Sequence, residues 1–416
     1  MSEQARPAGW YYGWNIVAVL IVSQLAANAM SYYSFPLFVP VWSAEMHAPP
    51  SEFHLCIMAM LVGASPASVL VGTLIDKYPA RLVFGLGLLG MALFYAAVSF
   101  ATVPWHVIAL YGLIASVALT MCTAIPANAV IARWFKRRLG FALGLSTCGI
   151  GLAAAIVPKI VAVALPDLGW RAVWRISAAI VLVVVLPLIV TVLRDRPTTR
   201  EGLHYLADDG AAAVHGHGGG GSAGAKITYR QIMARRTFWI LVIAYVVLIG
   251  SGTAFIQNFA VYGKTRGIGL SDVGSMVAAV GVAHVFAALI MGVLADRYGN
   301  RLPLAGMALA VIAGIACLAW GHSLPVYVLG AGLIGLNAAV FTPLSAAIAN
   351  EFGPDDFGKA FGLAMLFVPL TQAFPFLVAR QFEASGSYAV GMAGCAILLA
   401  VVAALALTLR ERPRAG

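Results

Sequence analysis

Long apolar segments recur along the chain, and mostly short polar connections separate them. Twelve of these segments reach about 20 residues, the length that an α-helix needs to cross the hydrocarbon core of a bilayer. They cover residues 15–40, 53–75, 82–102, 105–132, 139–165, 172–193, 237–262, 272–295, 302–320, 324–349, 357–381 and 388–409. The pattern predicts an all-α polytopic membrane protein whose consecutive helices run antiparallel.

One long polar stretch, residues 195–236, divides the twelve segments six and six. Its Gly-rich and His-containing composition is typical of a flexible linker. The part from Lys226 to Arg236 is basic and amphipathic, as expected of a segment lying on a membrane surface. We therefore predict three regions, which are a six-helix bundle over residues 1–194, a linker with an amphipathic segment over 195–236 and a second six-helix bundle over 237–416.

The composition fits a chain surrounded by lipid. Hydrophobic residues make up 61% of the 416 positions and charged residues only 10%, against about 25% charged residues in ordinary soluble domains. These values exclude a disordered chain, a disulfide scaffold and a soluble nucleic-acid binder. The five cysteines lie in apolar runs without the spacing of metal ligands, so we expect no metal and no cofactor.

The basic residues predict how the chain is oriented. Of the 26 Lys and Arg residues, 20 lie in the linker, the termini and the loops of the same side, 5 lie in the opposite loops, and Lys159 lies within a span. The positive-inside rule places the basic side in the cytoplasm. We expect a multi-pass protein of the plasma membrane, the inner membrane of a bacterium, with both termini cytoplasmic. Membrane lipid, rather than nucleic acid, is the expected surrounding partner, and the functional unit is expected to be a monomer.

The two halves repeat each other. The segment Gly72-Thr-Leu-Ile-Asp76-Lys-Tyr-Pro-Ala-Arg81 follows the second span, and Gly292-Val-Leu-Ala-Asp296-Arg297-Tyr-Gly-Asn-Arg301 follows the eighth, 220 residues later. Two halves with the same orientation are typical of parallel repeats related by an axis along the membrane normal.

These loops resemble the signature G-x-x-x-D-[RK]-x-G-R-[RK] of the major facilitator superfamily, although the first copy has Pro79 where glycine is usual. Two other stretches are similar to monocarboxylate and oxalate–formate porters. They are Gly9-Trp-Tyr-Tyr-Gly-Trp14 and the run from Arg133 to Gly144. The resemblance implies two pseudo-symmetric six-helix bundles that transport by alternating access. It favours a small organic monocarboxylate moved with protons or by anion exchange. The alternative is an efflux carrier for a hydrophobic metabolite or drug.

The repeated loops are the predicted conformational latch. Acidic side chains at these positions can bind a neighbouring helix N-terminus or a basic side chain and release it again. The alternative is that they are ordinary turn residues beside arginines. The residues assigned to this latch are Gly72, Asp76, Arg81, Gly292, Asp296, Arg297 and Arg301.

Polar side chains inside the spans are the candidates for contact with a substrate, because lipid does not tolerate them and the site of such a carrier lies between its halves. No Asp or Glu lies deep in a span. His284, midway along 272–295, can change charge near neutral pH and is the predicted proton-coupling residue; the alternative is a neutral histidine bonded to a neighbouring helix. The full set of candidates is Asn28, Tyr33, Asn128, Lys159, Gln257, Asn258, His284, Asn337 and Gln372.

The cationic anchors of the resembling porters are missing. Leu37 follows the Tyr33-Ser-Phe-Pro stretch where a Lys is expected, and Ala288 and Val368 occupy positions that carry Arg or Lys in those porters. Lys159 is one replacement, although its long side chain can equally extend outward to the membrane interface. An enzyme is not expected. The segment 353–359 has the spacing of a phosphate-binding loop, but Ala follows it and no strand precedes it.

Overall fold

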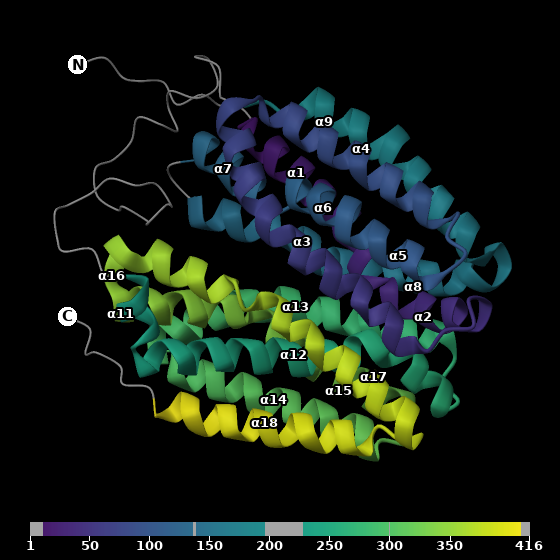
Figure 1. Cartoon of the computed structure of the whole chain (residues 1–416). Helices are drawn as coiled ribbons and strands as arrows, with labels where there is room; N and C mark the ends of the chain where they lie inside the picture. Colours follow the sequence, from purple (N-terminus) through teal and green to yellow (C-terminus); the bar gives the residue numbers. More distant parts are fainter. Residues whose placement is uncertain (1–10, 136–138, 196–227, 299, 409–416) are drawn as a thin grey trace, which may run out of the picture.

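The computed structural model describes residues 11–135, 139–195, 228–298 and 300–408, which form helices joined by short connections. Two bundles of helices lie side by side, one from the first half of the chain and one from the second (Figure 1). Their long axes run in the same general direction, so the bundles meet along a seam. The predicted all-α architecture with two bundles is confirmed.

The first bundle contains the helices that precede the linker. They are α1 (Gly13–Asn28), η1 (Ala29–Tyr33), α2 (Phe35–Glu45), α3 (Pro50–Lys77), α4 (Ala80–Val98), α5 (Pro104–Leu110), η2 (Tyr111–Ala115), α6 (Ser116–Cys122), α7 (Ala124–Trp134), α8 (Leu139–Ile180), η3 (Val181–Val185) and α9 (Leu186–Val192). Prolines begin α3 and α5, where a missing N–H costs nothing and the fixed φ suits the first turn.

The second bundle contains the helices that follow the linker. They are α11 (Tyr229–Met233), α12 (Arg236–Thr265), α13 (Leu270–Tyr298), α14 (Arg301–Trp320), α15 (Leu324–Gly335), η4 (Leu336–Val340), α16 (Phe341–Met365), η5 (Val368–Gln372), α17 (Ala373–Ser385) and α18 (Ala389–Leu407). The predicted amphipathic segment contains the short helix α11, which begins with a capping box between Thr228 and Gln231.

Ten stretches of the described chain are long and apolar enough to cross a membrane. One of them, Ala142–Val192, has 51 residues, about 75 Å of helix and more than twice the thickness of a bilayer core. It turns at Gly169, whose φ of 74° favours glycine. Its two ends come back together, since the Trp134 indole before it donates to the Arg194 carbonyl after it at 2.9 Å. This stretch therefore crosses twice. Together with the shorter apolar helix Leu324–Val340, it accounts for the twelve crossings expected from the sequence.

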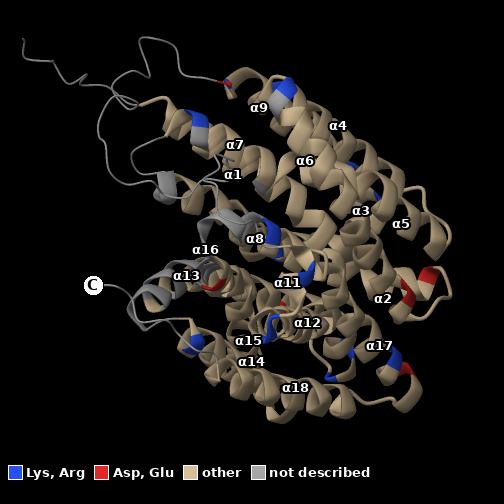
Figure 2. Ribbon diagram, turned by 60° about the vertical axis from the view of Figure 1, so that its left-hand side comes forward, with Lys and Arg blue, Asp and Glu red and all other residues tan. Residues whose placement is uncertain are grey.

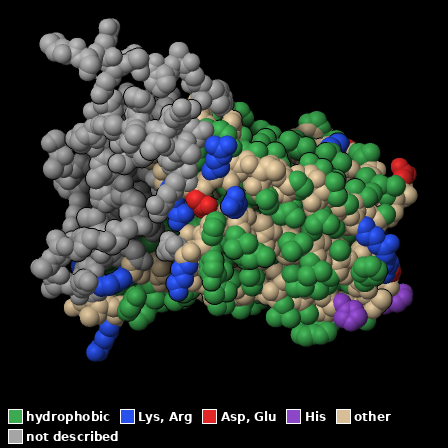
Figure 3. Space-filling view, turned by 90° about the horizontal axis from the view of Figure 1, so that it is seen from above, with side chains coloured by type: hydrophobic (Ala, Val, Ile, Leu, Met, Phe, Trp, Pro, Cys, Tyr) green, Lys and Arg blue, Asp and Glu red, His purple; other side chains and the backbone are tan. Residues whose placement is uncertain are grey.

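The molecule has two ends. The end where α1 begins, α9 ends and α18 ends is called the terminal end below, and the opposite end, with the α2–α3 and α17–α18 connections, is called the distal end (Figure 1). Described charged residues gather mainly towards these two ends and leave long uncharged stretches between them (Figure 2). A broad hydrophobic surface covers the middle of the molecule (Figure 3). Large apolar side chains of the described helices are exposed, among them Val69 at 73% and Leu113 at 75%, which suits a surface in contact with lipid.

The seam is closest where α8 of the first bundle packs on α13 of the second. A Cβ atom added at Gly281 would lie 2.6 Å from the carbonyl oxygen of Gly151 and 2.7 Å from the carbonyl carbon of Ala154. A Cβ added at Gly274 would lie 3.2 Å from the Pro158 carbonyl oxygen. Small residues allow such backbone contact between membrane helices, so the bundles touch here only because α13 carries glycine.

Candidate functional site

Lys159 joins the two bundles near the distal end. Its Nζ atom donates to the Ser271 carbonyl at 2.8 Å, to the Ser271 hydroxyl at 2.9 Å and to the Ser275 hydroxyl at 2.7 Å. Ser271 and Ser275 begin α13, whereas Lys159 belongs to α8. These contacts direct the side chain towards α13 of the other bundle. All three acceptors are neutral, so the ammonium charge is not cancelled by them.

A second tie joins α3 to α17. The backbone N–H of Ser51 donates to one carboxylate oxygen of Glu383 at 2.7 Å, and the Ser51 hydroxyl donates to the other at 2.8 Å. Arg380 lies 3.5 Å from the same carboxylate. Because Ser51 is in the first turn of α3, the acidic side chain also lies at the positive end of the helix dipole. The second bundle therefore supplies the anion that stabilises the start of a helix in the first.

Polar side chains of both bundles meet deeper in the seam. They are Tyr32, His54, Gln257, Asn258 and Gln372, called the central polar cluster below. Gln257 Nε2 donates to Gln372 Oε1 at 2.8 Å, and the Tyr32 hydroxyl lies beside both carboxamides. The Oε1 atom of Gln257 is buried and has no hydrogen-bond partner among the described residues. A buried acceptor without a partner is costly, so this atom is suited to receive a donor from a bound solute.

The cluster contains Tyr32 where the sequence favoured its neighbour Tyr33. The rings of the two tyrosines are 5.2 Å apart at 75°, and Tyr33 is buried. A π-helical turn over Ala29–Tyr33 shifts the helix register by adding a residue to the turn. Regular helical spacing does not anticipate that shift.

Three of the candidate asparagines have other positions. Asn28 Nδ2 donates to the Gln24 carbonyl of its own helix at 2.8 Å. Asn337 Nδ2 donates to the Leu248 carbonyl at 3.2 Å and so joins η4 to α12 inside the second bundle. Asn128 is exposed on α7. The structure brings Gln257, Asn258 and Gln372 together, but it does not add these three asparagines to the cluster.

His284 lies on α13, one turn from Gly281 and therefore near the contact with α8. Its Nδ1 atom is buried and has no hydrogen-bond partner among the described residues. Among the described residues, Nδ1 therefore makes no hydrogen bond to a neighbouring helix, which was the alternative role for this histidine.

His54 is a site residue that the sequence reading missed. It lies three residues after Ser51 and its side chain is buried. Its Nε2 atom lies 3.1 Å from Oδ1 of Asn258 in the other bundle. The signal was present, because His54 stands within the apolar run Phe53-His54-Leu55-Cys56 at the start of a predicted span. It stands near the edge of that span, whereas the candidates were sought deeper inside the spans.

The family model of the Major Facilitator Superfamily matches residues 20–281 and 241–416. The chain belongs to the Major Facilitator Superfamily. Within it, the chain resembles the monocarboxylate transporter group. It is 24% identical over 392 residues to human monocarboxylate transporter 11, which covers 88% of this chain and 76% of that protein.

Riboflavin transporter RibJ of Trypanosoma cruzi is 28% identical over 191 residues, a match that covers 44% of this chain and 40% of the length of RibJ. Among solved structures, a bacterial homologue of the human lysosomal transporter Spinster has a TM-score of 0.68, with 15% identity and 95% of both chains covered. At this identity the structural likeness shows a shared fold. The family match and the ten long apolar stretches together show a multi-pass membrane protein of this superfamily.

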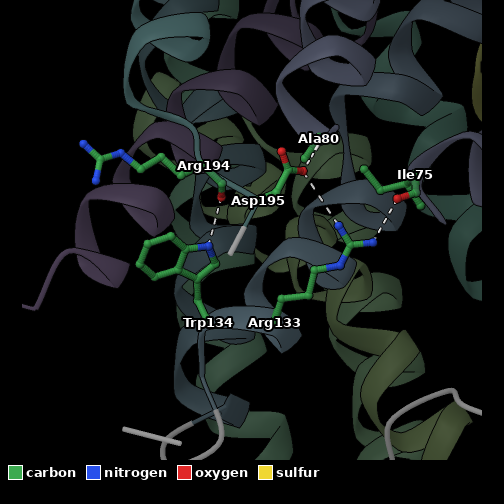
Figure 4. A network of polar contacts seen from close by, with 6 residues as sticks. All are labelled: Ile75, Ala80, Arg133, Trp134, Arg194 and Asp195. Carbon is green, nitrogen blue, oxygen red and sulfur yellow. Dashed lines mark hydrogen bonds and ion pairs between the residues drawn. The ribbon is translucent and has the colours of Figure 1, made fainter. Parts of the chain in front are cut away.

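At the terminal end of this superfamily member, a polar network joins three segments of the first bundle (Figure 4). Arg133 Nη2 donates to the Ile75 carbonyl at 2.9 Å and Nη1 lies 3.8 Å from Asp195. Asp195 accepts the N–H of Ala80, the first residue of α4. Asp195 therefore holds the start of α4, although the sequence assigned it to the linker.

Most of the predicted latch cannot be placed against this network. The side chains of Asp76, Asp296 and Arg297, and the surroundings of Gly292, lie outside the described part of the structure. Gly72 lies on α3 and has no atom within 4 Å of an added Cβ. Arg81 and Arg301 are exposed at the first turns of α4 and α14.

We expect Asp195→Ala to reduce stability by about 1 kcal/mol, because the start of α4 loses its acceptor. The melting temperature in detergent should fall by roughly 2 °C. Asp167→Ala, at an exposed position near the distal turn of α8, is the matched control and should melt like the unmodified chain. Equal melting temperatures for both variants would contradict the capping role of Asp195.

A cavity of about 740 Å³ lies apart from the seam, within the second bundle near the distal end. Residues of α12, α14 and α18 line it, including Tyr262, Ile315 and Met392. Because one bundle surrounds it, relative motion of the two bundles would not expose it alternately at the two ends. The seam, not this cavity, is therefore the candidate transport site.

Proposed function

We propose that this transporter moves a small organic monocarboxylate across the plasma membrane by alternating access, with protons or by anion exchange. The observation that carries the proposal is that polar side chains of both bundles meet at one seam. Lys159 lies beside it as a cation whose hydrogen-bond acceptors among the described residues are neutral oxygens. The similarity to human monocarboxylate transporter 11, which extends over 88% of this chain and 76% of that protein, supports the substrate class.

The ties near the distal end suit a step that must reverse. A hydrogen bond contributes about 0.5–1.5 kcal/mol net, and somewhat more when one partner is charged. We call the conformation in which the Lys159 and Ser51 ties are made the bridged form, and the one in which they are broken the open form. The two ties together therefore stabilise the bridged form by a few kcal/mol. Two conformations that differ by this amount can be exchanged by a bound solute. In the proposed cycle these distal ties break and form again.

The alternative is an efflux carrier for a hydrophobic metabolite or drug. Its support is the central polar cluster, in which Tyr32, Gln257 and Gln372 are uncharged. Two carboxamides and a hydroxyl match the donors and acceptors of a neutral heterocycle at least as well as a carboxylate. The partial similarity to a protein named as a riboflavin transporter points the same way.

Transport into proteoliposomes distinguishes the two. We expect accumulation of at least one labelled acid from a panel of formate, lactate, pyruvate, oxalate, benzoate and phenylacetate, and stimulation by a pH gradient or by a trans-loaded anion. Riboflavin serves as the neutral comparison. Transport of riboflavin without transport of, or competition by, any acid would contradict the carboxylate proposal and favour the alternative.

His284 is the proposed site of proton coupling during translocation. Its buried and unpartnered Nδ1 supports this role, because a histidine near the middle of a span is costly without a function. We expect His284→Gln to abolish accumulation driven by a pH gradient while counterflow of the same acid continues. Full pH-driven accumulation by this variant would exclude His284 from that role.

A further inference from the structure

We propose that His54 is a second proton-binding site, and that a proton bound there opens the distal end of the seam. The proposal rests on the alternating-access function. His54 belongs to α3 of the first bundle, and its hydrogen-bond partner Asn258 belongs to α12 of the second. A protonation at this position therefore acts directly on a contact that must break during the cycle.

The hydrogen bonds of Asn258 determine which nitrogen of His54 carries hydrogen. Asn258 Nδ2 donates two hydrogen bonds, to the Ala254 carbonyl at 2.7 Å and to the Pro375 carbonyl at 3.3 Å. The amide oxygen Oδ1 is then the atom that faces His54, at 3.1 Å from Nε2. An amide oxygen only accepts. His54 must donate from Nε2, so in its neutral form Nδ1 is the bare nitrogen.

The Nδ1 atom is where a second proton would bind. It is buried and has no hydrogen-bond partner among the described residues. The aromatic ring of Phe35 lies beside the imidazole, with 6.2 Å between the ring centroids. Protonation would place a second donor on the ring and a buried positive charge, and a buried charge is costly in apolar surroundings.

The charged and titratable groups around His54 do not remove that cost. From α17 the nearest is Glu383, whose two oxygens already accept from Ser51 and one of which lies 3.5 Å from Arg380. The cluster residues of α12 that face His54, Gln257 and Asn258, are uncharged.

The described residues of the other neighbouring elements also offer no counter-charge. α2 contributes Phe35. Tyr111 of η2 packs on Phe35, at 5.9 Å between ring centroids, and Cys56 on α3 itself is buried. None of these described groups is a carboxylate directed at Nδ1.

The bridged form therefore binds the neutral histidine better than the protonated one. Opening of the distal end separates α3 from α12 and admits water to the ring, where a charged imidazole is well solvated. By reciprocal linkage, a proton that binds the open form more tightly must also favour opening. If the distal end faces outward, an acidic exterior would load His54 and open the carrier to that side, which is the order of events that proton-driven uptake requires.

The test measures the opening of the distal end in the absence of any transported solute. Spin labels are attached at Ala44→Cys on α2 and Ala384→Cys on α17, two exposed distal positions, in a chain whose native cysteines are replaced. Distances are recorded by double electron–electron resonance in lipid nanodiscs from pH 8 to pH 5. We expect acidification to raise the ratio of open to bridged forms, by up to about tenfold for each pH unit. A pH-independent ratio in the chain with native His54 would overturn the proposal.

Three variants test whether His54 itself causes the response of the distal end to pH. His54→Gln keeps a donor for Asn258 and should reduce the pH response to less than about twofold over the whole range. His106→Gln, at an exposed distal histidine, is the matched control and should keep the full response. A response that survives His54→Gln, or that disappears in His106→Gln, would overturn the proposal.

Asn258→Asp tests the same proposal with His54 intact, so it remains informative if His54→Gln disturbs the fold. It places a carboxylate beside the ring, so that a protonated His54 gains a counter-charge in the bridged form. Acid should then fail to open the distal end, or should close it further. Unchanged opening by acid would contradict the proposed role. Because the titration needs no solute, a failure of the panel to be transported would be a separate result, bearing on the proposed function alone.

Discussion

Gly281→Val is expected to abolish transport and to leave the distal half of the seam open. Even the first carbon of a side chain at Gly281 would lie 2.6 Å from the Gly151 carbonyl oxygen and 2.7 Å from the Ala154 carbonyl carbon. These are backbone atoms of another helix, so they cannot move aside as the end of a flexible side chain would. Valine must therefore push α13 away from α8. Overpacking of this kind costs about 1–3 kcal/mol, which changes the equilibrium between two conformations by about 5- to 150-fold.

Gly306→Val provides the matched control for Gly281→Val. Gly306 lies on α14, is exposed and has nothing within 4 Å of an added Cβ. Both variants carry the same substitution in a membrane helix, but only Gly281 lies in the seam. We expect unchanged counterflow of the transported acid for Gly306→Val, and longer distances between the spin labels on α2 and α17 for Gly281→Val. Normal transport by Gly281→Val would show that the α8–α13 contact is not needed in the cycle.

Lys159→Met should have the second largest effect, since it removes all three hydrogen bonds that Nζ makes to Ser271 and Ser275. Methionine keeps most of the apolar length of the side chain, so the loss is chiefly polar. We expect the bridged form to lose about 2 kcal/mol, about 30-fold in the ratio of bridged to open forms. The same spin-label distances measure the change.

A role of Lys159 in attracting the solute gives an additional result. Removing the cation should raise the KM for an acid offered on the distal side more than the KM for a neutral solute, because the neutral solute responds only to the changed ratio of bridged to open forms. Lys264→Met is the control, because Lys264 is an exposed cation at the distal end of α12. Equal effects of the two substitutions would mean that Lys159 acts through general surface charge and not as a tie across the seam.

The fold could be predicted largely from the period and length of the apolar segments. Because each crossing needs about 20 apolar residues, the length and order of the apolar segments were enough to predict the two sets of helices. The repeated loops at Gly72 and Gly292 related the halves to each other. The edges of elements were harder, and Asp195 shows why. A residue that follows an apolar run is indistinguishable from linker until Arg133 and the start of α4 are brought beside it in space.

The site was predicted in part, for a similar reason. Hydropathy identifies a polar residue inside a span but does not say which way it points. Gln257, Asn258 and Gln372 face the seam, whereas Asn337 is used inside one bundle. The π-helical turn before Ser34 and the pairing of His54 with Asn258 depend on contacts between distant segments. Neither follows from the local sequence.

The most direct test of the account is whether the seam opens alternately to the two faces of the membrane. Tyr32 is a suitable reporter, since it lies half-buried in the central polar cluster. In a chain with its native cysteines replaced, the Tyr32→Cys variant should react with a membrane-impermeant maleimide added at either face. A cross-link between Ser51→Cys and Glu383→Cys, whose parent side chains are 2.8 Å apart, should abolish reaction from the distal face and leave reaction from the terminal face. Reaction from the distal face that persists after cross-linking, or reaction from a single face in the uncross-linked chain, would contradict alternating access through this seam.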